Sequence, residues 1–236
     1  MHDFLTSGLQ GFGPLLAQGT WMTVKLALLS LALSLALGLI GASAKLSRSR
    51  LLRLPATLYT TLIRSVPDLV LILLIFYGGQ DIINRVAPLL GYDDYIDLNP
   101  LVAGIGTLGF IFGAYLSETF RGAFLGIPKG QAEAGAAYGM SGVQVFFRIM
   151  VPQMIRLAIP GFTNNWLVLT KATALISVVG LQDMMFKAKQ AADATREPFT
   201  FFLAVAALYL VLTSVSLLAL KYLEKRYSVG VKAAEL

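Results

Sequence analysis

The sequence of 236 residues contains no cysteine and only one histidine. Without cysteine the chain has no disulfide, thiolate nucleophile, iron–sulfur ligand or zinc–cysteine site. The histidine, His2, stands at the amino terminus, so we expect neither a histidine-built metal site nor a Ser-His-Asp triad. Charge is also scarce, because 14% of the residues are charged, against about a quarter in a soluble domain. The composition therefore indicates a membrane protein that performs no covalent chemistry.

Five apolar stretches are long enough to cross a bilayer core, which takes about 20 residues of helix. They are residues 26–44, 54–80, 98–117, 157–182 and 198–220. The second stretch is interrupted by Arg64 and Asp68, and the fourth by Lys171. We therefore expect an all-α integral membrane protein with five transmembrane helices and no resident metal.

The lysine and arginine residues are unevenly distributed between these stretches. Twelve fall in segments 45–53, 121–156 and 221–236, whereas four fall in segments 80–97 and 183–197. By the positive-inside rule the first group is cytoplasmic, which places the amino terminus outside and the carboxyl terminus in the cytoplasm. The net charge of +6 then reflects orientation and contact with anionic lipid, and predicts no nucleic-acid partner.

The chain is expected to form one membrane domain at residues 20–219, between an external segment at 1–19 and a cytoplasmic tail at 220–236. Small residues at four-residue spacing predict close crossing of the first and third spans. They are Ser34, Gly38 and Ala42 in the first span, and Gly109 and Gly113 in the third.

The cytoplasmic segment between the third and fourth spans is too long for a simple connection. Pro128 suits the first turn of a short, alanine-rich helix, and Gly139 is placed to end it. Ser141 then caps a second helix, in which Gln144 completes a capping box. Pro152 is expected to stop that helix. Segment 128–152 thus predicts two short helices that meet at a glycine corner.

The first of these helices surrounds one carboxylate, Glu133, with small side chains. Small side chains let a helix enter deep into a groove. From the residues alone two interpretations are open: a helix that docks into a partner protein, and a hairpin that lies on lipid headgroups.

The same segment resembles the EAA loop of permease subunits in ABC importers, which reads E-A-A, three residues, G, nine residues, I, any residue and L-P. The matching positions are Glu133, Ala134, Gly139, Ile149 and Pro152. Gly135 and Val151 replace the second alanine and the leucine of that pattern. The resemblance implies a type I ABC importer permease fold with two cytoplasmic coupling helices, whose Glu133 makes polar contacts with an ATPase.

Nucleotide chemistry is expected on another protein. The chain has no G-x-x-x-x-G-K-[ST] phosphate loop of its own. ATP and magnesium are therefore expected on a partner ATPase, with no cofactor in this chain and no enzymatic activity of its own.

Outside the EAA loop the similarity extends over nearly the whole chain. Five segments resemble polar amino-acid permeases, and among them the Q-type permease subunits of histidine/lysine/arginine/ornithine transporters: 64–68, 118–122, 164–166, 171–175 and 226–232. Related opine permeases share much of this pattern. The resemblance implies a heterodimer with a second homologous permease, two ATP-binding subunits and a periplasmic amino-acid-binding protein, in the bacterial inner membrane. A passive channel or a membrane scaffold is the alternative from another class.

Charges within the predicted spans need an explanation, because each costs on the order of 2.5 to 3.5 kcal/mol at mid-bilayer. Asp68 and Lys171 each lie about 21 Å from the cytoplasmic start of their span, by the helical rise per residue. Arg64 is expected one turn below Asp68 on the same helix face. Two interpretations are open: a closed ion-pair network, or a site for an amino-acid zwitterion.

Two more polar positions complete the candidate substrate pathway. Glu118 lies near the cytoplasmic end of the third span and either pairs with Arg121 or lines the pathway. Asn164, near the start of the fourth span, either bonds to a neighbouring helix or lines the pathway. The candidate pathway residues are Asp68, Arg64, Glu118, Asn164 and Lys171.

Overall fold

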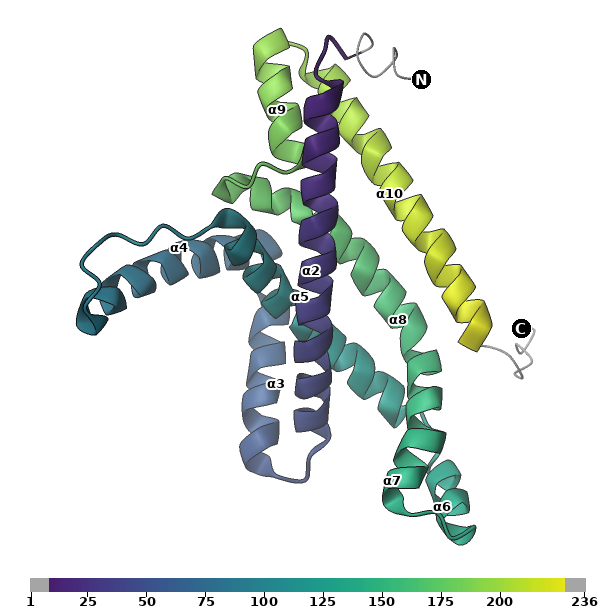
Figure 1. Ribbon diagram of the computed structural model, residues 1–236. Helices are drawn as coiled ribbons and strands as arrows, with labels where there is room; N and C mark the ends of the chain where they lie inside the picture. The colour runs from purple at the N-terminus through teal and green to yellow at the C-terminus, as the bar shows by residue number, and fades with distance from the viewer. Residues whose placement is uncertain (1–8, 228–236) are drawn as a thin grey trace.

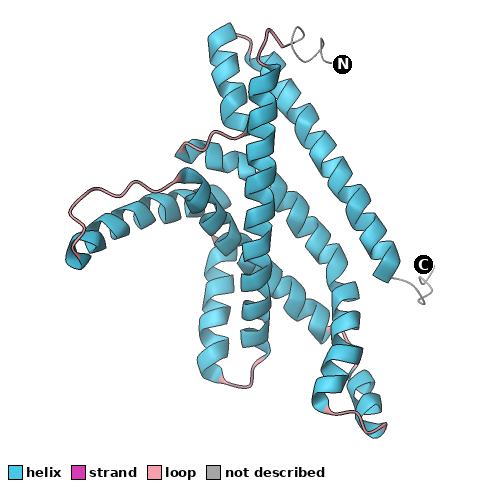
Figure 2. Cartoon of the chain, viewed as in Figure 1, coloured by secondary structure: helices cyan, strands magenta, loops and turns pink. Residues whose placement is uncertain are grey.

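The structure is a computed structural model that describes residues 9–227. Within that range every regular element is a helix, which confirms the predicted all-α class (Figure 2). The α-helices are α2 (Gly13–Leu46), α3 (Arg50–Ser65), α4 (Asp68–Val86), α5 (Pro100–Leu125), α6 (Lys129–Ala137), α7 (Gly142–Val145), α8 (Val151–Ala172), α9 (Met184–Thr195) and α10 (Pro198–Tyr227). His2 and residues 228–232 of the tail motif lie outside the described residues.

Five helical stretches of the described chain are long and apolar enough to cross a membrane, as the sequence predicted. They are Gly13–Leu46, Asp68–Leu90, Pro100–Leu125, Gly142–Val179 and Pro198–Tyr227. The number agrees with the prediction, but the second stretch does not begin where it was expected.

The prediction of one continuous helix over 54–80 was wrong. α3 ends at Ser65, and α4 begins at Asp68 after Pro67. Pro67 has no backbone N–H and disfavours the helical conformation of the residue before it. Val66 is accordingly extended, with φ −109° and ψ 139°. α4 therefore turns away from α3 and projects to the side of the molecule (Figure 1), and Arg64 and Asp68 do not share one helix face.

The long helices α2 and α5 cross closely at the centre of the fold, as their small residues predicted (Figure 1). A Cβ atom added to Gly109 would lie 2.5 Å from the Leu33 side chain, and one added to Gly38 would lie 2.7 Å from Leu116 Cβ. The backbones can approach this closely only because no side chain intervenes. The crossing fixes the relative position of the polar residues toward the carboxyl-terminal ends of α2 and α5.

A second core joins α9 to α2 and α10. The segment expected between the last two spans contains α9, a helix whose buried side includes Met184 and Ala188. Asp183 caps this helix, because its side chain accepts a hydrogen bond of 2.9 Å from the Phe186 N–H. The side chains of Leu16 in α2 and Phe201 in α10 pack in the same core. α9 is thus a structural part of the end of the molecule where α2 begins (Figure 1).

Candidate substrate pathway and coupling surface

A polar cavity of about 490 Å³ opens between α2, α3 and α5. Its lining is Lys45, Thr60, Thr61, Arg64, Ser65, Tyr115 and Glu118. Two residues of the predicted pathway, Arg64 and Glu118, therefore meet in one cavity. Lys45 and Tyr115 also line it, although the sequence did not single them out.

Tyr115 contacts both charged residues that border the break between α3 and α4. Its hydroxyl donates to Asp68 Oδ1 at 3.4 Å, and the Arg64 Cζ atom lies 5.8 Å from the centre of its ring. Among residues 9–227, no ion pair joins Asp68 to Arg64 or to Lys171. The closed network that the sequence left open is therefore not formed by direct pairing. Asp68 instead lies half-buried beside Tyr115, with its charge unpaired within the described chain.

Glu118 is held by two cations. Arg121, three residues later on α5, lies 3.0 Å from its carboxylate, as one of the two sequence interpretations held. Lys45, from the last turn of α2, contacts the other carboxylate oxygen and donates to Thr60 Oγ1 at 2.7 Å. Lys45 and Glu118 are 73 residues apart in the chain, and they meet because α2 and α5 cross. One signal in the sequence could have indicated that Lys45 lies at this crossing. Lys45 follows Ser34, Gly38 and Ala42 on the helix face that crosses α5.

Asn164 and Lys171 lie elsewhere. Asn164 is exposed on α8, and its neighbour Asn165 donates to Thr119 Oγ1 at 2.8 Å, which joins α8 to α5. Lys171 lines a separate cavity of about 420 Å³ with residues of α9 and α10, among them Met185 and Tyr209. The structure therefore does not bring either residue into the polar cavity.

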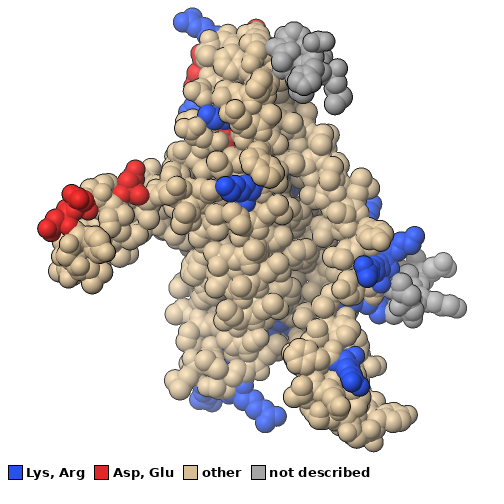
Figure 3. Space-filling model, in the orientation of Figure 1, with Lys and Arg blue, Asp and Glu red and all other residues tan. Residues whose placement is uncertain are grey.

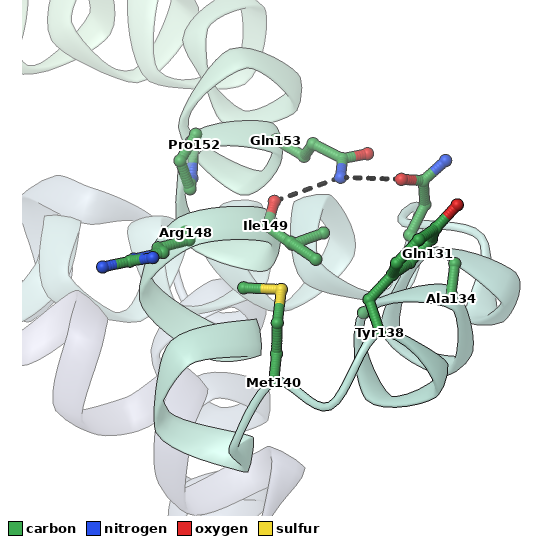
Figure 4. A pocket seen from close by; sticks show the side chains of 9 residues that line it. Gln131, Ala134, Tyr138, Met140, Arg148, Ile149, Pro152 and Gln153 are labelled. Carbon is green, nitrogen blue, oxygen red and sulfur yellow. Dashed lines mark hydrogen bonds between the residues drawn. The ribbon is translucent and has the colours of Figure 1, made fainter.

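The two short helices predicted for segment 128–152 are present as α6 and α7. Ser141 caps α7, and both hydrogen bonds of its capping box with Gln144 are present. Gly139 has φ +76°, a left-handed conformation that glycine adopts without steric cost. The corner between α6 and α7 borders a cavity of about 470 Å³ (Figure 4). The residues that line it are Gln131, Ala134, Gly135, Tyr138, Met140, Arg148, Ile149, Pro152 and Gln153.

The prediction that Pro152 stops the second helix was wrong. After α7 the chain makes a π turn over Phe146–Met150 and continues directly into α8, with Pro152 in its first turn. In the widened turn the Val151 N–H donates to the Phe146 carbonyl. A proline lacks the N–H that an ordinary turn uses, and π turns of this kind are frequent at functional sites. α7 and α8 therefore belong to one continuous helical stretch, Gly142–Val179.

The side chain of Gln153 supports this junction. Its amide donates to the Ile149 carbonyl at 3.1 Å and reaches the Gln131 side chain on α6 at 3.4 Å (Figure 4). Gly135 packs against the same turn, since an added Cβ would lie 2.6 Å from Ile149 Cδ1. This contact gives a reason for glycine where the EAA pattern has its second alanine. Glu133 is exposed on the outer side of α6 and is free to meet another protein.

Comparison with known proteins identifies this architecture. The family described as "Binding-protein-dependent transport system inner membrane component" matches residues 34–229. The HisQ permease of the histidine/lysine/arginine/ornithine transport system of Salmonella typhimurium is 54% identical over 228 residues, which cover 97% of this chain and 100% of HisQ. The OccQ permease of the octopine transport system of Rhizobium radiobacter is 41% identical and covers 89% of this chain and 91% of OccQ.

A solved structure supports the same conclusion. A crystal structure of an amino acid ABC transporter with histidines superposes with a TM-score of 0.77 at 29% identity, over 90% of this chain and 94% of the other. The expected fold is thereby confirmed as the type I ABC permease fold, and hydrolysis of ATP belongs to a separate subunit. The chain belongs to the family of binding-protein-dependent transport system inner membrane components and is a permease subunit of an ABC importer.

Proposed function

We propose that this permease imports histidine, lysine, arginine and ornithine across the bacterial inner membrane by alternating access. It works beside a second, homologous permease, receives its substrate from a periplasmic binding protein and is driven by two ATP-binding subunits. The similarity to HisQ over the whole chain supports this substrate class. The observation on which the proposal depends most is the polar cavity between α2, α3 and α5.

The chemistry of the cavity suits a cationic amino acid. Such a substrate offers an α-ammonium, an α-carboxylate and a cationic side chain, and so needs two acids and one base. Glu118 in the lining and Asp68 beside it supply the acids, and Arg64 in the lining supplies the cation for the α-carboxylate. We propose that Asp68 makes the first contact with the substrate, because no cation pairs with Asp68 within the described chain. Asn164 and Lys171 would join the pathway only where the second permease completes it.

The orientation follows from charge. We infer an external amino terminus and a cytoplasmic carboxyl terminus, with residues 1–19 outside, a membrane domain at 20–219 and a tail at 220–236. The distribution of lysine and arginine supports this assignment. Basic side chains gather where α2 turns into α3, whereas the tip of the α4 arm carries acidic ones (Figure 3). The first of these faces would then lie at the cytoplasmic surface.

The coupling segment, residues 128–152, transmits the conformational change of the ATPase to the membrane helices. In this proposal α6 docks into a groove on the ATPase, with Glu133 as its polar contact and Ala134 allowing close approach. The Gly139 corner sets the direction of α7, while Ile149 and Pro152 join both helices to α8. Closure of the ATPase dimer moves these helices together and opens the spans outward. ATP must favour one state by several kcal/mol to switch the population decisively.

Substrate competition tests this assignment. The permease is assembled with its partner subunits in liposomes. ATP-driven uptake of labelled arginine is measured in the presence of unlabelled histidine, lysine, ornithine or octopine as competitor. We expect the three amino acids to compete strongly and octopine weakly. If octopine competes best, the chain serves opines, the second candidate that its similarity to OccQ favours.

A further inference from the structure

Lys45 occupies the cytoplasmic end of the polar cavity. Its side chain is 11% exposed, and that of Glu118 is 17% exposed. The ammonium contacts Glu118 from α5 and donates to Thr60 Oγ1 from α3 at 2.7 Å. A protein ammonium on a carboxylate inside the cavity makes the same contact that the side chain of a lysine or ornithine substrate would make.

The charges of the cavity limit what can enter it. Its lining contains two cations, Lys45 and Arg64, and one acid, Glu118, while a second acid, Asp68, lies beside the lining against Tyr115. Arg121 also pairs with Glu118, at 3.0 Å, from the more exposed side. A cationic substrate would add one more positive charge beside these groups, and like charges repel strongly away from bulk water. The substrate side chain can therefore reach Glu118 only when a resident cation withdraws.

Lys45 is the cation that is placed to withdraw. It belongs to the last turn of α2, directly before the short connection to α3. A lysine stem is long and flexible, so its ammonium can extend past the helix end to the headgroups and water. Arg64, by contrast, lies over the Tyr115 ring, farther from that end of α2. Movement of one side chain would thus free one oxygen of Glu118, Oε1, without movement of a helix, while Arg121 stays paired with Oε2.

We propose that Lys45 is a tethered substitute for the imported cation. The Lys45 ammonium pairs with Glu118 while the cavity is empty. The side chain of arginine, lysine or ornithine then displaces this ammonium toward the cytoplasm. When Lys45 returns to Glu118, it competes with the bound substrate and so speeds release on the cytoplasmic side. The inference rests on the proposed function, and it makes Lys45 a specificity-determining residue for cationic side chains.

The first test compares Lys45→Met with Lys25→Met, a matched change on the same helix where the lysine is exposed. Arginine binding to the assembled complex without ATP is measured at pH 8. We expect Lys45→Met to bind arginine about fivefold to tenfold more tightly, because no ammonium competes for Glu118. Histidine is neutral at that pH, so its affinity should barely change. Unchanged or weaker arginine binding by an assembled Lys45→Met complex would overturn the proposal.

The second test uses the wild-type complex, so it does not depend on how a variant assembles. Amine labelling of Lys45 is quantified by mass spectrometry with and without arginine, with Lys221, exposed on α10 outside the coupling segment, as internal control. Arginine should raise the labelling of Lys45 severalfold and leave the labelling of Lys221 unchanged. If Lys45 is labelled equally with and without arginine in a complex that imports arginine, the proposed role of Lys45 is wrong and the proposed function stands. A complex that imports no arginine contradicts the proposed function instead.

Discussion

Tyr115 and Asp68 lie on different helices, yet the tyrosine hydroxyl donates to the aspartate carboxylate at 3.4 Å. The contact forms because the chain breaks at Pro67, so that Asp68 starts a new helix beside α5. It places a carboxylate next to the polar cavity, and the Arg64 guanidinium lies 5.8 Å from the centre of the same tyrosine ring. One aromatic side chain thus contacts both the acid and the cation that we propose for the substrate pathway.

Asp68→Asn should weaken arginine and lysine uptake about tenfold or more, because a charge-assisted contact to the substrate is lost. Tyr115→Phe should have a smaller effect, about threefold to tenfold, since it removes one hydrogen bond and keeps the carboxylate. Uptake by assembled complexes, with the amount of copurified ATPase as control, checks both. If Asp68→Asn loses expression and assembly as much as uptake, Asp68 supports the fold and does not bind substrate.

Glu133→Arg should uncouple ATP hydrolysis from uptake while the chain still inserts into the membrane. The exposed carboxylate would be replaced by a bulky cation at the surface proposed to meet the ATPase. The ratio of ATP hydrolysed to arginine imported measures the effect, and Glu197→Arg, an exposed change outside the coupling segment, serves as control. A normal ratio in the Glu133→Arg variant would show that Glu133 does not belong to the surface that contacts the ATPase.

Gly135→Ala should destabilise the coupling segment by about 1 to 3 kcal/mol, as overpacking of a close contact does. The added Cβ would meet Ile149 Cδ1 at 2.6 Å. Ile149→Val removes that methyl group, so the double variant should recover most of the loss. Thermal unfolding and coupled uptake of the two single variants and the double variant check this. Additive losses would show that the two residues do not share one contact.

The stability of the core that joins α9 to α2 and α10 should depend on pH through Asp183. Burial raises the pKa of Asp183 to about 7, and the hydrogen bond from the Phe186 N–H only partly offsets that rise. One carboxylate oxygen is buried without a partner in the described chain, which also favours the protonated form. A raised folded-state pKa stabilises the protein below pH 4, and this contribution is lost as the pH rises toward 7.

Asp183→Asn should therefore abolish this dependence, because asparagine keeps the helix cap and does not titrate. Thermal unfolding at pH 5 and pH 8 checks the prediction. Wild type should lose stability relative to the variant between the two values. An equal change in both proteins would mean that Asp183 is ionised throughout this range.

Local patterns in the sequence predicted much of the fold. Hydropathy gave the number of candidate spans, and the Ser141 cap with the Gly139 corner gave the two coupling helices. Hydropathy did not reveal the break at Pro67, because apolar residues continue on both sides of it. The meeting of Lys45 with Glu118 could not be predicted either, since it depends on how two distant helices cross.

Uptake of radiolabelled arginine by liposomes that contain the complete complex tests the central claim most directly. The account predicts that arginine accumulates above its external concentration only when ATP is inside and the binding protein is outside. Arginine that merely equilibrates across the membrane, equally with and without ATP, would contradict a coupled importer and indicate a passive channel.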